Sequence, residues 1–215
     1  MPPFIPDLPV ILAFALATIV LAITPGPDMA LQISRAVNYG RGHGLAVAAG
    51  AMSGILVHTT LVALGISVLI VAAPAAFFAL KLAGAAYLLW LAVQAILQGG
   101  GLRIAQKAAR VPTLVESYVT GVGINLLNPK VVLFFMTFLP QFVDRHDPAA
   151  PLKLFFLGGE FILVSIPLAI ATVLAAEALA NLLTRSVWVQ RALNWTFAAV
   201  FTAFAATILF AEAKK

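Results

Sequence analysis

The sequence contains no cysteine among its 215 residues. Disulfide bridges, thiolate metal sites and thiol relays within the chain are therefore excluded. Charged residues are scarce as well: they make up 10% of the chain, against about 25% in an ordinary soluble domain. Hydrophobic residues account for 62%. This composition predicts an integral membrane protein, and the length fits one transmembrane domain over residues 1–215.

The net charge of +5 comes mostly from basic residues in short polar segments. Distributed in this way, they do not form the basic patch of a nucleic-acid-binding protein. We therefore expect the chain to contact the lipid bilayer and no nucleic acid. We also predict neither a metal nor a cofactor. The glycine-rich segment Gly40–Gly44 is expected to be a loop by its glycine content, and it resembles a phosphate-binding loop only superficially because no strand precedes it.

Long apolar stretches dominate the sequence. A helix needs about 20 apolar residues to span the hydrocarbon layer. Six stretches are long enough, and proline-containing motifs break the first and the fourth. The sequence therefore predicts an all-α membrane protein with six transmembrane helices, at roughly Leu8–Val37 (broken), Leu45–Ala73, Ala75–Leu97, Ser117–Leu139 (broken), Leu152–Leu174 and Val187–Ala211.

The first break is the segment Thr24–Asp28, which reads Thr-Pro-Gly-Pro-Asp. A proline lacks the N–H of a helical residue and its ring clashes with the carbonyl four residues back, so the two prolines free the carbonyls of Leu21 and Ile23. A new helix is expected here, with Thr24 as N-cap and Pro25 as its first residue. Irregular backbone at membrane depth is tolerated where it lines a cavity, so the break indicates a functional site.

A similar break follows about a hundred residues later, at Asn128-Pro129-Lys130. Asn128 is the expected N-cap and Pro129 the first helical residue, and the proline frees the carbonyl of Asn125. Lys130 then lies in the first helical turn, as Asp28 does at the first break. The two breaks thus bring opposite charges to membrane depth.

The chain divides into two halves of three expected helices each, residues 1–98 and 117–215, joined by a basic connector at 99–116. An odd number of helices in each half gives the halves opposite orientations, which predicts an inverted repeat that meets at the bilayer midplane. Small residues such as Gly50 and Gly54 let helices approach closely. The Lys and Arg count places the connector in the cytoplasm and both termini outside.

Such breaks can bind a zwitterion. The carbonyls freed at Leu21, Ile23 and Asn125 are acceptors for an ammonium group, and the free N–H groups after the prolines are donors for a carboxylate. The charges of Asp28 and Lys130 complete the match to an α-amino acid. The alternative is that these two side chains form a purely structural ion pair between the halves.

Two further polar residues lie in apolar stretches. Glu160 follows a Gly-Gly pair, and a carboxyl in a low-dielectric site can carry a proton through a transport cycle; the alternative is a solvated residue near a helix end. Asp28 is the other candidate for carrying protons. His58 is interpreted as a hydrogen-bonded core residue. An intramembrane hydrolase would need His58 beside Ser53, Thr59 or Thr60, and no third group that would orient the histidine is visible. An ion channel lacks support because no filter segment repeats.

The two breaks and their spacing resemble the LysE/RhtB family of amino-acid exporters, and the resemblance runs nearly end to end. It includes Gly40–Leu45, Gly84–Leu88 and Gly121–Val143. It implies a transporter, not an enzyme, that exports amino acids across the bacterial inner membrane, driven by protons, and it leaves a homodimer open. Because few other acids lie in the membrane, neutral substrates such as homoserine, threonine or leucine are favoured over basic ones. The expected substrate-binding residues are Thr24, Pro25, Gly26, Pro27, Asp28, Asn125, Asn128, Pro129 and Lys130.

Overall fold

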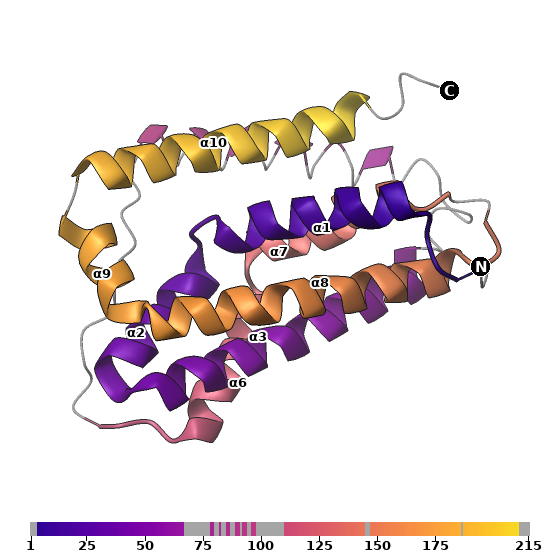
Figure 1. The fold of residues 1–215 in the computed structure, drawn as a ribbon. Helices are drawn as coiled ribbons and strands as arrows, with labels where there is room; N and C mark the ends of the chain where they lie inside the picture. Colours follow the sequence, from indigo (N-terminus) through magenta and orange to yellow (C-terminus); the bar gives the residue numbers. More distant parts are fainter. Residues whose placement is uncertain are drawn as a thin grey trace.

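The computed structural model describes residues 4–66, 110–144, 147–185 and 187–210, with short pieces between residues 78 and 97. The regular elements of these residues are helices (Figure 1). The α-helices are α1 (Leu8–Ile23), α2 (Pro27–Tyr39), α3 (Arg41–Leu61), α6 (Leu114–Leu126), α7 (Pro129–Leu133), α8 (Ala150–Leu174), α9 (Ala176–Arg185) and α10 (Val187–Phe210). Single turns of π-helix follow α3 at Val62–Ile66 and α7 at Phe134–Phe138, and a 3-10 turn covers Leu139–Phe142.

Four of the expected membrane spans have counterparts in these helices. Two continuous helical stretches, Arg41–Gly65 and Ala150–Leu174, are long and apolar enough to cross a membrane. Two helix pairs meet the same criterion together but are bent, α1 with α2 by 54° and α6 with Pro129–Phe142 by 51°. The expected broken helices are therefore confirmed. The stretch Ala75–Leu97 lies mostly outside the described residues, and the six-helix inverted repeat stays a prediction.

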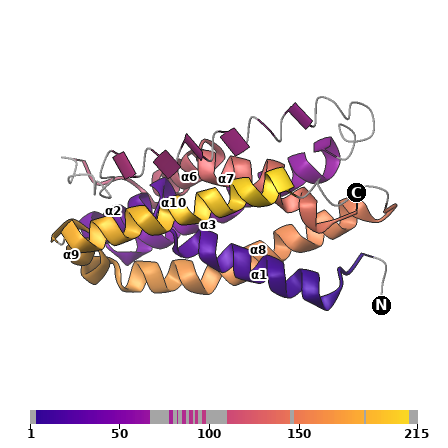
Figure 2. The ribbon, with the colours of Figure 1, turned by 90° about the horizontal axis from the view of Figure 1, so that it is seen from above.

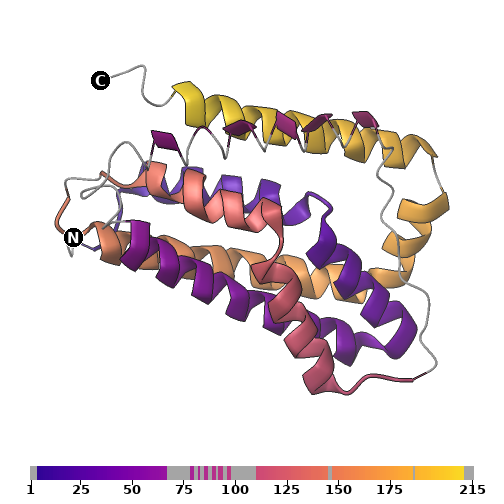
Figure 3. The same ribbon diagram turned by 180° about the vertical axis from the view of Figure 1, so that it is seen from behind.

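The helices form layers along one bundle axis. In Figures 1 and 3, α3 and α8 lie below α1 and α7, and α10 forms an outer layer. Figure 2 shows α6 and α7 on one side of the bundle and α1 and α8 on the other. In Figure 3, α2 runs from its break toward one end of the bundle, whereas α7 runs from its own break toward the other end. The N-terminal ends of these two half-helices therefore both lie near the middle of the bundle.

At the first break, α2 begins later in the chain than the sequence predicts. The first residue of α2 is Pro27 and its N-cap is Gly26, whereas Thr24 ends α1 and returns its N–H to the carbonyl of Val20. The prediction of Thr24 as N-cap is therefore wrong. A residue before proline avoids helical angles, and both Thr24 (ψ 117°) and Gly26 (φ −160°, ψ −177°) are extended. A helix can thus start only after the second of these residues.

The second break follows the sequence prediction. Asn128 is the N-cap of α7, and its side-chain Oδ1 accepts a hydrogen bond from the backbone N–H of Lys130 at 3.1 Å. Pro129 is the first helical residue. A single proline leaves only one pre-proline residue, so the local chemistry suffices to fix where this helix begins.

The glycine-rich segment after α2 is a helix start and not a loop. Gly40 alone makes the turn, with φ of 95°, and α3 begins at Arg41. Gly44 lies inside α3, where a Cβ would come within 2.9 Å of the Ala36 side chain and 3.1 Å of Val173. A small residue is required there for packing against neighbouring helices. The prediction of a loop from glycine content is therefore wrong.

Close backbone contact joins α3 to α6. A Cβ added at Gly50 would collide with the carbonyl of Tyr118, and one at Gly121 would collide with the backbone of Val47. A Cβ at Gly54 would displace the amide of Asn125. The expected close approach at Gly50 and Gly54 is thus confirmed, and it holds the C-terminal end of α6 against the middle of α3.

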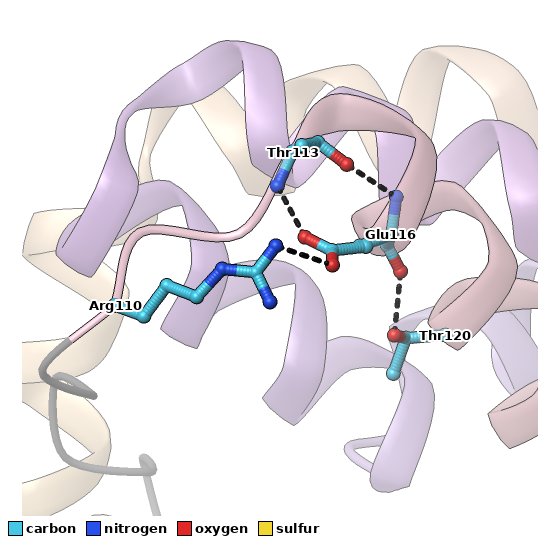
Figure 4. A network of polar contacts seen from close by, with 4 residues as sticks. All are labelled: Arg110, Thr113, Glu116 and Thr120. Atoms are coloured by element: carbon cyan, nitrogen blue, oxygen red, sulfur yellow. Dashed lines mark hydrogen bonds and ion pairs between the residues drawn. The ribbon is translucent and has the colours of Figure 1, made fainter.

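A capping box fixes the start of α6 (Figure 4). The hydroxyl oxygen of Thr113 accepts from the Glu116 N–H at 3.1 Å, and the Glu116 carboxylate accepts from the Thr113 N–H at 2.6 Å. Arg110 adds an exposed ion pair to the same carboxylate at 3.0 Å. Satisfying the first N–H groups in this way sets where α6 begins, and with it the face on which Asn125 lies.

Candidate functional site

Lys130 is the best-buried charged residue of the site, with 7% of its surface exposed. Its Nζ donates to the carbonyl oxygens of Leu21 at 3.1 Å and Thr24 at 2.9 Å, both at the C-terminal end of α1. Pro25 has no N–H to offer the Leu21 carbonyl, so that acceptor is available to the lysine. The negative end of the α1 dipole also favours a cation here. The lysine therefore stabilises the broken end of α1.

Gly26 leaves room for this lysine. A Cβ at residue 26 would lie 3.2 Å from Lys130 Nζ and 3.4 Å from its Cε, tighter than most side-chain contacts. The glycine is thus needed for the close approach of α7 to the first break. Its extended backbone angles are open to any residue, so conformation alone does not require it.

Asp28 does not pair with Lys130. Within the described residues no ion pair joins the two side chains; instead Asn125 Nδ2 donates to Asp28 Oδ2 at 3.0 Å. The alternative of a structural Asp28–Lys130 ion pair is therefore wrong. Because an ionised carboxylate can only accept, the Asn125 amide must turn its nitrogen toward it. Among the described residues, Asp28 Oδ1 and Asn125 Oδ1 are both buried and have no partner.

Two carbonyls expected to face a ligand are already used by the protein. The Leu21 carbonyl accepts from Lys130, and the Asn125 carbonyl accepts from the backbone N–H of Asn128 at 3.1 Å. His58 Nε2 lies 3.4 Å from the same Asn125 oxygen. The prediction that these carbonyls are open acceptors is therefore wrong. Among the described side chains of the two breaks, Asp28 Oδ1 and Asn125 Oδ1 are instead acceptors without a partner.

A cavity opens beside these groups, with about 590 Å³ of empty space when its open side is included. Asp28, Asn125 and Lys130 line it, together with residues of α3 and α8. The breaks thus bring three of the expected binding residues to one cavity. The others (Thr24, Pro25, Gly26, Pro27, Asn128 and Pro129) build the breaks without lining this cavity.

Two polar residues of the cavity wall were not anticipated. Gln32 lies one turn after Asp28 on α2, and Ser165 lies on α8; both line the cavity and are buried. Helical spacing could have identified Gln32, because residues four apart share a face. Ser165 gave no comparable signal, since a single serine in an apolar helix is common and the packing of α8 was unknown.

Glu160 lies near the middle of α8, away from both ends of that helix. Both of its carboxylate oxygens are buried and have no hydrogen-bond partner among the described residues. The alternative of a solvated residue near a helix end is therefore wrong. Glu160 does not line the cavity, so it is not placed to contact a ligand there.

His58 has no hydroxyl partner in the part of the chain that the structure describes, which argues against the hydrolase interpretation. His58 stacks on Phe135, with ring centroids 5.8 Å apart, and its Nδ1 has no partner among the described residues. The hydroxyls of Thr59 and Thr60 donate to carbonyls of their own helix, and Ser53 bonds Tyr118 and the Ala49 carbonyl. A nucleophile activated by an adjacent base is thus absent from this part of the chain.

Comparisons with known proteins relate this chain to one family of translocators and to efflux proteins. The family model described as LysE type translocator matches residues 19–212. A homoserine/homoserine lactone efflux protein of Salmonella typhimurium is 26% identical over 195 residues, which cover 88% of this chain and 90% of that protein. A leucine efflux protein of Klebsiella pneumoniae is 26% identical over 147 residues, 68% of this chain and 69% of its own. An uncharacterized membrane protein of Vibrio cholerae is 34% identical over 138 residues, which cover 64% of this chain and 67% of that protein. No solved structure matches.

Proposed function

Since this chain belongs to the LysE type translocator family, we propose that it exports amino acids with uncharged side chains across the bacterial inner membrane by proton antiport. The observation that carries the proposal is the cavity at the two helix breaks. Its wall offers acceptors from Asp28 and Asn125 and a donor from Lys130, so opposite ends of an α-amino acid have matching partners.

The substrate ammonium binds at Asp28. The Asn125 amide holds one carboxylate oxygen of Asp28 in place at 3.0 Å, and Asp28 Oδ1 and Asn125 Oδ1 are acceptors that have no partner among the described residues. An ammonium group donates three hydrogen bonds and can satisfy both. A charge-assisted bond to the carboxylate is the stronger of the two. Asn125 therefore orients Asp28 and also contributes to the binding of the ammonium.

The substrate carboxylate binds at the ends of the two half-helices. Two of the three N–H groups of Lys130 are occupied by carbonyls, which leaves one for an anion. The N-cap of α2 is Gly26, which has no side chain to cap the helix, so the N–H groups of its first turn are available as well. The positive ends of both half-helix dipoles favour a carboxylate there.

An uncharged side chain fits the rest of the cavity. Asp28 and Lys130 are the charged side chains in its lining, and the ammonium and carboxylate of the substrate occupy both. A basic side chain would be left without a counter-charge, at a cost of several kcal/mol, about the cost of an unpaired buried charge. The names of the relatives in Salmonella and Klebsiella, homoserine and leucine efflux proteins, are in keeping with such substrates.

Competition in inverted membrane vesicles tests the zwitterion site. Uptake of labelled leucine and labelled homoserine is measured with an excess of leucine, of 3-methylbutylamine (leucine without its carboxylate) or of 4-methylpentanoate (leucine without its ammonium). We expect inhibition by leucine alone, because each fragment leaves one half of the site unpaired. Equal inhibition by the amine would instead indicate export of amines, and the proposed function would fail.

Proton coupling is assigned to Glu160 and Asp28. Both carboxylate oxygens of Glu160 are buried without a partner among the described residues, and the residue lies outside the cavity lining, which suits a group that exchanges a proton and leaves substrate contacts to others. Glu160→Gln is therefore expected to reduce gradient-driven uptake into inverted vesicles to the level seen without a gradient. Exchange of labelled for unlabelled substrate, which needs no gradient, should persist. Gradient-driven transport at the wild-type rate in this variant would remove Glu160 from the mechanism and leave Asp28.

A further inference from the structure

The hydroxyl of Ser165 is unlike most hydroxyls in the helices of this protein. Helical serine and threonine side chains commonly donate to the carbonyl four residues earlier. Eight side chains of the described residues do so, over 2.5 to 3.2 Å: Thr24, Ser53, Thr59, Thr60, Thr120, Thr137, Thr172 and Thr196. Ser165 is 4% exposed and its Oγ has no partner among the described residues.

This unpartnered hydroxyl belongs to the cavity wall that α8 contributes. Phe161, Ser165, Leu168, Ala169 and Thr172 all line the cavity, and their spacing of three or four residues places them on one face of α8. Thr172 donates its hydroxyl to the Leu168 carbonyl at 2.9 Å. Ser165 is therefore the residue of this wall whose hydroxyl is free to bind a ligand, and it is surrounded by apolar neighbours.

We propose that Ser165 is a specificity-determining residue that hydrogen-bonds a hydroxyl on the side chain of the transported amino acid. The inference rests on the proposed function: Asp28, Asn125 and Lys130 hold the ammonium and carboxylate, and the side chain extends along the wall of α8. Phe161 and Leu168 pack against its carbon atoms. A buried hydroxyl pair is worth more than contact with a methyl group, because a methyl leaves the serine unpaired.

Isosteric substrates test this role in inverted vesicles. Threonine differs from valine, and homoserine from 2-aminopentanoate, by a hydroxyl in place of a methyl. For the wild type we expect transport efficiency to favour the hydroxylated member of each pair by about three- to tenfold, the factor that one net hydrogen bond supplies. Ser165→Ala should bring both ratios close to one.

Thr172→Val is the matched control, because it removes a hydroxyl from the same wall that is already bonded within α8. It should keep the wild-type ratios, whatever it does to the rate. Wild-type ratios near one, or ratios unchanged by Ser165→Ala, would overturn the role of Ser165 while the export function stands. If Ser165→Ala does not reach the membrane, wild-type ratios near one still overturn the role of Ser165. If wild-type vesicles move none of these amino acids or leucine, the proposed function itself fails.

Discussion

Asp28→Asn should lower amino-acid export by about 100-fold, the scale of losing the charged partner of a buried ionic contact, while the protein still reaches the membrane in normal amounts. The asparagine has the same shape as the aspartate and its side-chain oxygen can still accept from Asn125 Nδ2, so the contact between α2 and α6 persists. Only the negative charge that faces the substrate ammonium is lost.

Export and membrane-inserted protein are measured side by side for this variant. Glu116→Gln is the matched control, since it converts a carboxylate to an amide at the exposed start of α6, and glutamine also serves in a capping box. The control should export at the wild-type rate. Export near the wild-type rate in Asp28→Asn would show that the carboxylate does not bind the ammonium, and would contradict the proposed site.

Replacing Lys130 by methionine should abolish export and also weaken the fold, which separates it from the Asp28 variant. Methionine matches the length of the lysine but leaves the Leu21 and Thr24 carbonyls without their donor. We expect a loss of about 2 kcal/mol for unpaired buried carbonyls, seen as a melting temperature lower by roughly 5 °C in detergent.

Lys153→Met is the control for Lys130→Met. Lys153 pairs with Asp147 near the start of α8, outside the cavity, and such partly exposed pairs contribute little. Its export should stay near the wild-type rate. If Lys130→Met melts like the wild type, the lysine does not hold the end of α1, and its carbonyl bonds are incidental to stability.

The double exchange Asp28→Lys with Lys130→Asp should not restore export. It would place a carboxylate against the carbonyl oxygens of Leu21 and Thr24, which repel it, and would bring a cation to the first turn of α2, where the positive end of the helix dipole disfavours it. The exchange would succeed only if the two residues were partners of each other, and they are not. Recovery of both abundance and export would contradict this account of the site.

The position of the two breaks was predictable from sequence because covalent chemistry sets it. Proline removes a backbone donor wherever it stands, and at Pro25, Pro27 and Pro129 it stands beside a glycine or an N-cap asparagine that helps to end one helix and begin the next. Pro167 has no such neighbour and lies inside the continuous helix α8. The Asn128 cap was predictable for the same reason, since its partner is the N–H two residues later. The resemblance to amino-acid exporters depended on these motifs, and the family match over residues 19–212 confirms it.

Local chemistry was insufficient where two rules competed. Thr24 is a good N-cap residue by composition, but it precedes one proline while Gly26 precedes another, and the second restriction delays α2 to Pro27. At Gly40–Gly44, glycine content predicted a loop, whereas only Gly40 makes a turn. Gly44 is explained by side chains of α2 and α8 that the local sequence does not reveal.

The sequence by itself determined that the chain is a membrane protein of this family, that two helices break, and that Asp28 and Lys130 lie at the breaks. Tertiary structure decided what these charges contact. Lys130 meets carbonyls more than a hundred residues earlier in the chain, and Asp28 meets Asn125. It also placed Ser165 at the cavity. The physical reason is that backbone breaks depend on adjacent residues, whereas partners of buried side chains depend on how α1, α2, α6, α7 and α8 pack together.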